Sequence, residues 1–156
     1  MSLKRKIVGE VEIRATCVDV LHDLLKQSPH DASHVVPHFL HGVDLHDGEH
    51  GKIGSTFTWR HTVDGKPLVA KTILEEIDEE KKLVRYRIIE GDLLDKYKTI
   101  SGQCQVVPKD SETCIAIWTF EYEKLHPGIP EPTGLLESWI AASTDIDGHH
   151  HGVKKK

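Results

Sequence analysis

The sequence predicts an α+β domain in which a curved antiparallel sheet wraps around one C-terminal helix. Three observations support this fold class. Most of the chain alternates apolar and polar residues with a period of two, which is typical of strands with one buried face. Two short segments with helical spacing interrupt that alternation near the beginning of the chain. One longer amphipathic segment follows the last strand.

The chain is predicted to begin with a strand at residues 6–14, "KIVGEVEIR", in which Ile7, Gly9, Val11 and Ile13 share one face. Their neighbours on the other face are mostly charged. This strand therefore has one buried and one solvated side.

Two helices are predicted next. The segment "TCVDVLHDLLKQS" carries apolar residues at helical spacing, namely Val18, Leu21, Leu24 and Leu25. Thr16 is placed to cap this helix, and Ser28-Pro29 is placed to end it. A second short helix, "HDASHVVPHF", is expected to end near Pro37, because the residue before a proline disfavours helical backbone angles.

Six further strands complete the predicted sheet, at residues 39–46, 54–63, 67–77, 82–90, 97–107 and 113–124. Asp64-Gly65 is a signal for a tight hairpin. The loop "DGEHGKIGST" joins the second and third strands and holds three glycines, which we expect at positions with positive φ.

This glycine loop does not fit a phosphate-binding loop. That motif needs a glycine where the chain has His46, and a serine or threonine where it has Ile53. A phosphate loop also leads into a helix, whereas "STFTWRHTV" has the periodicity of a strand. The loop is therefore predicted to connect two strands.

The final segment is predicted to be an amphipathic helix. Prolines at 127, 130 and 132 break the preceding strand, and "TGLLESWIAASTDIDGHHH" then places apolar residues on one stripe, namely Leu135, Leu136, Trp139, Ile140 and Ile146. Gly148 and Gly152 are expected to end this helix early.

Length and composition predict a single domain over residues 1–156 that lies in the cytoplasm. The net charge is -5 and the pI is near 6.2, which gives little support to nucleic-acid binding. The sequence holds no apolar run of about 18 residues, so no membrane span is predicted. Its three cysteines have no C-x-x-C spacing, which suits reduced thiols better than a disulfide framework.

Nearly the whole chain, from about Lys6 to Gly148, resembles the major latex protein branch of the birch-pollen-allergen-like superfamily. This superfamily includes the pathogenesis-related class 10 proteins of plants. The resemblance is carried by "VGEVEI" at 8–13, "VDLHDGEHGKIGS" at 43–55, "VDGKPLVAK" at 63–71, "RIIEGDLLDKYK" at 87–98 and "FEYEK" at 120–124. It implies a seven-stranded sheet gripping the C-terminal helix, two short helices between the first and second strands, and a large, mainly apolar cavity.

The resemblance also implies two alternative functions. Most members are regarded as carriers that bind, store or transport hydrophobic plant metabolites in defence and stress, and this is the function we expect. A few members are enzymes of benzylisoquinoline or morphinan alkaloid biosynthesis, such as norcoclaurine synthase, thebaine synthase and neopinone isomerase. The expected partner is an alkaloid-, steroid- or flavonoid-like ligand, with no cofactor, and the chain is expected to be a monomer or homodimer. A third reading, a protein that acts through its loops as an interaction surface, has the least support.

Strand alternation predicts which residues line this cavity. The predicted ligand-binding residues are Phe57, Trp59, His61, Ala70, Thr72, Leu74, Val84, Tyr86, Ile88, Ile100, Cys104, Ala116, Trp118, Leu136, Trp139 and Ile140. The same alternation turns inward Ser55, Gly102, Cys114 and Phe120. The C-terminal helix contributes Leu136, Trp139 and Ile140 to the cavity and also turns Leu135 and Ser143 toward it. Plain core packing is the alternative for each apolar member, and a slip of one residue would invert a whole strand.

Proton transfer is the chemistry that these residues would support under the enzyme alternative. His61 would accept or donate a proton, Tyr86 would donate a hydrogen bond to a carbonyl or enolate oxygen, and Asp95 or its neighbour Asp92 would act as a base. The competing interpretation of His61 is a hydrogen-bonded histidine that orients a ligand. For the two aspartates it is turn and cap chemistry.

The twelve histidines raise the question of a metal site. His30, His34 and His38 are four residues apart, a spacing that can place ligands on one face of a helix. Pro37 interrupts that helix, and no cysteine or carboxylate stands at a recognisable metal spacing. A solvated helix face is therefore preferred, and no metal is predicted. The ending "DGHHHGVKKK" departs from the apolar residues that usually continue the family's last helix.

Overall fold

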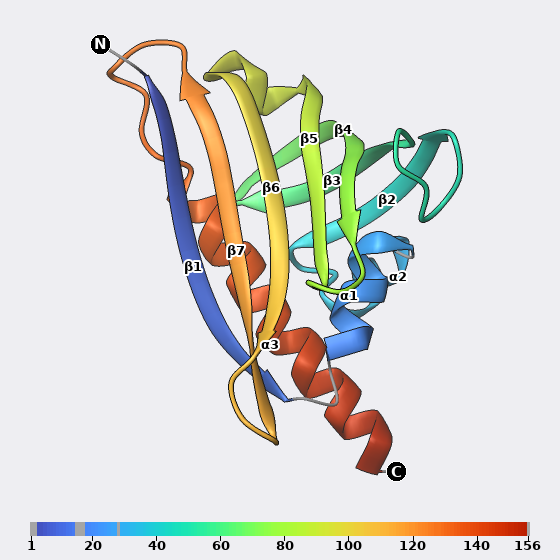
Figure 1. Ribbon diagram of the computed structural model, residues 1–156. Coiled ribbons are helices and arrows are strands. Elements are labelled where there is room, and N and C mark those ends of the chain that lie inside the picture. Colours follow the sequence, from blue (N-terminus) through green and yellow to red (C-terminus); the bar gives the residue numbers. More distant parts are fainter. Residues whose placement is uncertain (1–2, 15–17, 28, 156) are drawn as a thin grey trace.

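In the computed structural model, an antiparallel sheet curves around one long helix (Figure 1). The structure describes residues 3–14, 18–27 and 29–155. Its strands are β1 (Lys4–Arg14), β2 (Leu40–Asp47), β3 (Thr56–Val63), β4 (Lys66–Asp78), β5 (Leu83–Gly91), β6 (Tyr97–Pro108) and β7 (Thr113–Lys124). Its helices are α1 (Val18–Lys26), α2 (Pro29–Val35), α3 (Thr133–Lys155) and the short 3-10 helix η2 (Asp92–Asp95). The predicted fold class and order of elements are confirmed.

The seven strands form one sheet in the order β1-β7-β6-β5-β4-β3-β2. Every strand pairs with its neighbour in the chain except β1, which lies beside β7. Helix α3 runs along the concave side of the sheet, and α1 and α2 lie at one end of it (Figure 1). The interior is therefore enclosed by the inner faces of the strands, by α3 and by α1.

The predicted hairpin between β3 and β4 is confirmed by its backbone angles. Asp64 has φ 52° and Gly65 has φ 76°, so both central residues are left-handed, as in a type I′ turn. The β5–β6 ladder is short, because β5 pairs with β6 only from Leu83 to Arg87. Beyond that point η2 lies between the two strands, and its Leu93 packs against the core.

The glycine loop between β2 and β3 is held by its own backbone. Gly48, Gly51 and Gly54 all have positive φ, at 97°, 76° and 93°, which confirms the reason for the three glycines. The Ser55 hydroxyl accepts a hydrogen bond from the Glu49 N–H at 2.8 Å and donates one to the Glu49 carbonyl at 2.6 Å. The chain then enters strand β3 rather than a helix, so the geometry is not that of a phosphate loop.

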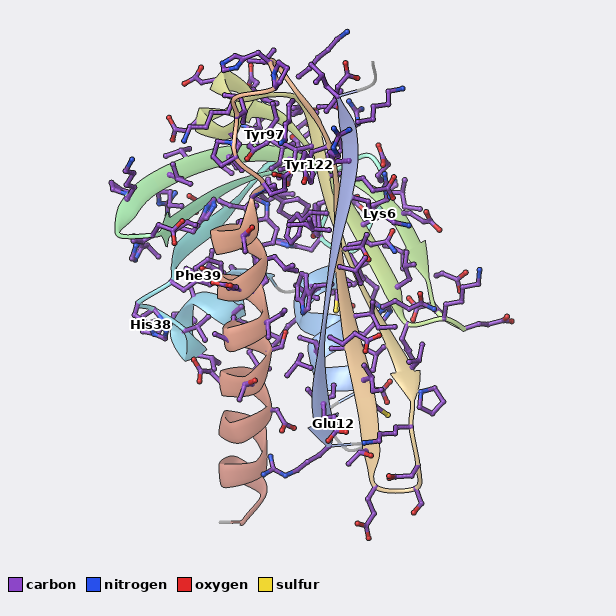
Figure 2. All side chains as sticks on the ribbon, turned by 90° about the vertical axis from the view of Figure 1, so that its left-hand side faces the viewer. Lys6, Glu12, His38, Phe39, Tyr97 and Tyr122 are labelled. Carbon is purple, nitrogen blue, oxygen red and sulfur yellow. The ribbon has the colours of Figure 1, made fainter. Side chains whose placement is uncertain are left out.

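The side chains predicted to face inward on the strands are buried or half-buried, so the predicted orientation of each strand is confirmed. On β3, Phe57 and Trp59 are almost fully buried, while Arg60, the residue after Trp59, is exposed. Side chains fill the space between the sheet and α3, and Phe39 lies beside that helix (Figure 2). Its neighbour His38 points outward, and its side chain is 70% exposed.

The prediction that α3 ends early at Gly148 and Gly152 is wrong. The helix runs to Lys155 and includes both glycines. Glycine in a helix interior costs only about 1 kcal/mol relative to alanine, and it does not prevent helical backbone angles. Glycine ends a helix where a left-handed residue is needed, and neither position adopts that conformation.

Two further expectations concern the helices and the cysteines. The predicted cap Thr16, the stop residue Ser28 and Cys17 lie outside the described residues. Cys104 and Cys114 are buried free thiols. Within residues 3–14, 18–27 and 29–155, no helix is both long enough and apolar enough to cross a membrane.

Candidate functional site

A cavity of about 70 Å³ lies between the concave face of the sheet and α3. Its wall combines residues of five strands, two α-helices and η2. The lining residues are Leu25, Trp59, His61, Ala70, Thr72, Tyr86, Ile88, Leu93, Gly102, Trp118, Phe120, Leu135 and Trp139. Most of them are apolar or aromatic, and none carries a formal charge at neutral pH. This is the composition of a site for an apolar small molecule.

All three tryptophans of the chain meet at this cavity. The rings of Trp118 and Trp139 are stacked, with centroids 4.9 Å apart and planes inclined by 22°. Trp139 also meets Trp59 edge-on at 5.9 Å and Phe39 edge-on at 4.9 Å. Such arrangements are favourable for the ring quadrupoles, so the aromatic side chains form a connected wall.

Hydroxyl groups fix two of these rings. The Trp59 indole N–H donates to the Thr72 hydroxyl at 2.7 Å, and the Trp118 N–H donates to the Ser143 hydroxyl at 2.7 Å. Both bonds are buried. Buried indole N–H groups need such acceptors, because an unpaired polar group away from water is costly.

Tyr86 connects the sheet to helix α1. Its hydroxyl donates to the Leu25 carbonyl at 2.8 Å, and its ring lies 5.2 Å from Trp59. Burial raises the pKa of the Tyr86 phenol far above its usual value. Tyr86 therefore stays protonated, and its proton is already used in a hydrogen bond.

His61 brings an ionisable group into the wall. The residue is only 5% exposed, and burial lowers the pKa of its imidazole to about 4, although the Trp59 backbone partly opposes the shift. The ring is therefore neutral at physiological pH. Its Nδ1 is buried, and no group in the described part of the chain forms a hydrogen bond with that atom. Phe39 meets the ring edge-on at 5.9 Å.

The two aspartates of the β5–β6 connection lie apart from this wall. The Asp92 carboxylate accepts a hydrogen bond from the Val69 N–H of β4 at 2.8 Å, a long-range contact rather than local turn or cap chemistry. Asp95 is exposed on η2 and is not among the lining residues. The structure therefore brings His61 and Tyr86 together at the cavity, but not Asp95.

The other predicted site residues divide into two groups. Those that line the cavity are Trp59, His61, Ala70, Thr72, Tyr86, Ile88, Trp118 and Trp139. Those packed in the core beside it are Phe57, Leu74, Val84, Ile100, Cys104, Ala116, Leu136 and Ile140. Of the other residues predicted to face inward, Gly102, Phe120 and Leu135 line the cavity, whereas Ser55, Cys114 and Ser143 are buried away from it.

Sequence reasoning missed Leu25 and Leu93 as lining residues. Leu25 belongs to the apolar stripe of α1, and such a stripe predicts that the helix packs on the core without showing that it reaches the cavity. Leu93 belongs to a connection without strand periodicity, where alternation gives no direction. The run "DLLD" could have indicated this position, because two consecutive leucines between charged residues are expected to pack into the core.

The cavity is smaller than the family resemblance implied. Pockets for drug-sized ligands usually measure about 300–1,000 Å³. A cavity of about 70 Å³ holds only a few water molecules. The large internal cavity is thus not open in this conformation, because the tryptophan rings occupy much of the interior.

The comparisons with known proteins agree with this architecture. A family model described as the pathogenesis-related protein Bet v 1 family matches residues 2–151. The chain belongs to the Bet v 1 family. MLP-like protein 43 of Arabidopsis thaliana is 39% identical over 149 residues, which cover 95% of this chain and 94% of that protein. The predicted membership in the major latex protein and pathogenesis-related class 10 group is confirmed.

Solved structures show the same fold. The crystal structure of ginseng major latex-like protein 151 from Panax ginseng has a TM-score of 0.90 and 34% identity, and the match covers 95% of this chain and 98% of that one. Norcoclaurine synthase from Thalictrum flavum, solved with dopamine and hydroxybenzaldehyde, has a TM-score of 0.71 and 20% identity over 96% of this chain and 89% of that chain. At that identity the similarity shows the fold alone. It also shows that this fold includes an enzyme.

Proposed function

We propose that this chain binds small hydrophobic plant metabolites in its internal cavity, and so stores or transports them in the cytoplasm during defence or stress. The observation that carries the proposal is the neutral His61 imidazole in a mostly apolar wall. Its buried Nδ1 lacks a hydrogen-bond partner among the described residues. Buried polar groups in folded proteins are nearly always paired, and an exception calls for an explanation such as a bound water, an ion or a functional role. Of the unpaired buried atoms in the described residues, that of His61 is the one that belongs to a residue lining the cavity.

The chemistry of the wall defines the class of ligand. Trp59, Trp118 and Trp139 offer ring faces, and no lining side chain carries a charge at neutral pH. A charged ligand would lose its hydration without gaining an ion pair. The ligand is therefore neutral and largely apolar, with one hydrogen-bonding group directed to His61.

A matched pair of compounds tests this proposal. Flavone and a hydroxyflavone differ by one hydroxyl group, and both would be incubated with the protein for native mass spectrometry and titration calorimetry. The hydroxylated compound is expected to bind about fivefold more tightly, since one net hydrogen bond contributes about 1 kcal/mol. This preference should disappear in the variant His61→Leu.

His41→Leu is the control variant, because His41 is exposed on β2 and contacts the Thr62 hydroxyl on the outside of the sheet. It should keep the preference of the parent protein. Failure of a panel of flavonoid, steroid and alkaloid compounds to bind the folded protein would contradict the proposal.

Proton-transfer catalysis in alkaloid biosynthesis is the second candidate. It is favoured by one observation, namely that His61 and Tyr86 both line the cavity. Their pKa values speak against it, because a general acid or base works best when its pKa lies near the working pH. A morphinan such as neopinone, incubated with the protein and analysed for isomerised product, separates the two candidates. Turnover that is lost in His61→Ala would favour the enzyme.

A further inference from the structure

The three tryptophans at the cavity are held in different ways. Trp59 is fixed by the Thr72 hydroxyl of β4, and Trp118 by the Ser143 hydroxyl of α3, each through a buried hydrogen bond of 2.7 Å. Rotation of either ring would leave a buried indole N–H without an acceptor, which is unfavourable. These two rings are therefore a fixed part of the wall.

Trp139 has no such anchor. No residue in the described part of the chain accepts a hydrogen bond from its indole N–H, and the side chain is only half-buried. Its ring is held by the stack on Trp118 and by edge contacts with Phe39 and Trp59. These contacts require an aromatic neighbour but no specific acceptor atom, so another flat ring can replace them.

The backbone that carries Trp139 is held independently of its ring. The Ser143 hydroxyl accepts from the Trp118 indole and donates to the Trp139 carbonyl at 2.9 Å. One serine thus ties Trp118 to the turn of α3 that carries Trp139. A rotation about the Trp139 side-chain bonds moves the indole without disturbing the helix or the Trp118 ring.

We infer that a planar aromatic ligand displaces the Trp139 ring and takes its place against the fixed face of Trp118. This inference rests on the proposed function and names the ligand class and the moving part of the site. It also accounts for the small cavity, because withdrawal of one indole adds the volume of a fused bicyclic ring system to about 70 Å³. A planar ligand recovers the stacking contact that Trp139 gives up, and a puckered ligand does not.

Fluorine NMR of protein labelled with 5-fluorotryptophan observes each ring separately, because the chain has three tryptophans. The single variants Trp59→Phe, Trp118→Phe and Trp139→Phe assign the three signals. On addition of flavone, the Trp139 signal should move most, the Trp118 signal should also move, and the Trp59 signal should change least. Binding of flavone with an unmoved Trp139 signal would overturn the inference and leave the proposed function standing.

A second measurement compares flavone with flavanone, whose saturated central ring makes the molecule non-planar. Flavone should bind roughly two- to tenfold more tightly to the unaltered protein, the range expected for one aromatic stack. Trp139→Ala should bind flavone more tightly than the unaltered protein, because no ring has to be displaced. Equal affinities for the two compounds would overturn the inference. If neither compound nor any other of the panel binds, the proposed function itself fails.

Discussion

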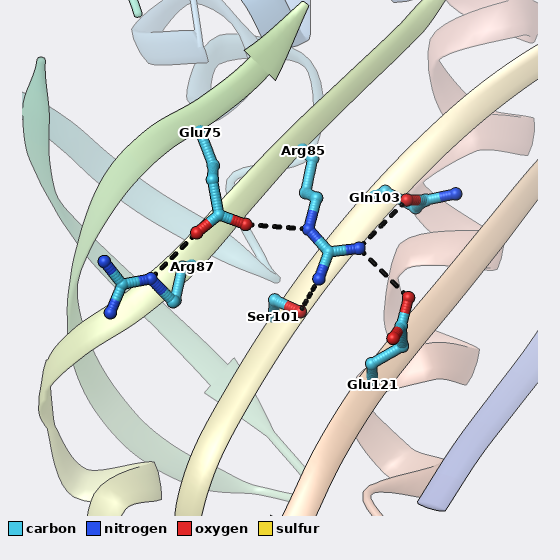
Figure 3. A network of polar contacts seen from close by, with 6 residues as sticks. All are labelled: Glu75, Arg85, Arg87, Ser101, Gln103 and Glu121. Carbon is cyan, nitrogen blue, oxygen red and sulfur yellow. Dashed lines mark hydrogen bonds and ion pairs between the residues drawn. The ribbon is translucent and has the colours of Figure 1, made fainter. Parts of the chain in front are cut away.

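The two faces of strands β4 to β7 differ in the charge of their polar side chains. On the inner face, the polar side chains that line the cavity are neutral, and Thr72 accepts a hydrogen bond from the Trp59 indole. On the outer face, six charged or polar residues form a single network around Arg85 (Figure 3). Its Nε donates to Glu75 at 2.8 Å, its Nη1 to Gln103 and Glu121, and its Nη2 to Ser101.

The difference follows from access to water. Burial opposes ionisation of Glu75, but hydrogen bonds from Arg85 and Arg87 hold the pKa of its carboxyl below the usual value. On the inner face, burial lowers the pKa of His61 more than the Trp59 backbone and Asp92 raise it, so its ring is neutral. Side chains on the outer face thus remain charged, because several partners and water stabilise the charge. His61, on the inner face where we expect a ligand, is neutral.

The largest expected effect comes from breaking the inner face. Phe57→Ala removes a fully buried ring and should lower the free energy of unfolding by about 3–5 kcal/mol. Thr58→Ala, the next residue along β3 and on the outer face, should change it by less than about 1 kcal/mol. Urea denaturation of both variants measures the contrast. Similar losses in the two variants would mean that the faces are not energetically distinct.

The next effect is a pH dependence caused by His61. Its pKa is about 4 in the folded protein and 6.5 as a free side chain, so the unfolded chain binds a proton first as the pH falls. The contribution of the neutral ring is complete above pH 6.5 and is lost as the pH falls toward 4. It amounts to about 3 kcal/mol.

Urea denaturation between pH 7 and pH 4 measures this effect, and His61→Leu should lose stability less steeply over that range. The slope will not vanish, because burial also lowers the pKa of His22 on α1. An identical slope in protein and variant would show that folding does not lower the pKa of His61.

The smallest effect is expected on the outer face. Glu75→Gln weakens the ion pairs with Arg85 and Arg87, which are both partly exposed to solvent. Such pairs contribute about 0.2–1 kcal/mol each, and salt screens them. The variant should lose roughly 1 kcal/mol in dilute buffer and much less in about 1 M sodium chloride. A larger loss that persists in salt would assign the network a role in packing.

The fold followed from the sequence because period-two alternation and turn residues determine strands and hairpins. The alternation also gave the inward side of each strand correctly, as the buried Phe57 and Trp118 show. It did not show which inward side chains reach the cavity, because Phe57 and Trp59 obey the same parity while only Trp59 lines it. That difference depends on how deeply α3 sits in the sheet, a tertiary property.

The sequence also gave no measure of the cavity's size. The family resemblance implied a large cavity, whereas the stacked rings of Trp118 and Trp139 leave about 70 Å³. Ring stacking depends on side-chain rotamers from two different elements. The predicted end of α3 was wrong for another reason. Glycine only weakens a helix locally, and the helix continues through Gly148 to Lys155.

The position of β1 beside β7 has a consequence for how the chain reaches its fold. Lys4 pairs with Glu123 and Arg14 with Thr113. The first strand of the sheet along the chain can therefore pair only after the last strand is available. Contacts between residues this distant in sequence slow folding, because a long loop must close before they form. Until β7 emerges, β1 has a free edge and the interior has no wall on that side. We therefore expect the cavity to become closed, and able to hold a ligand, only after β7 has paired with β1.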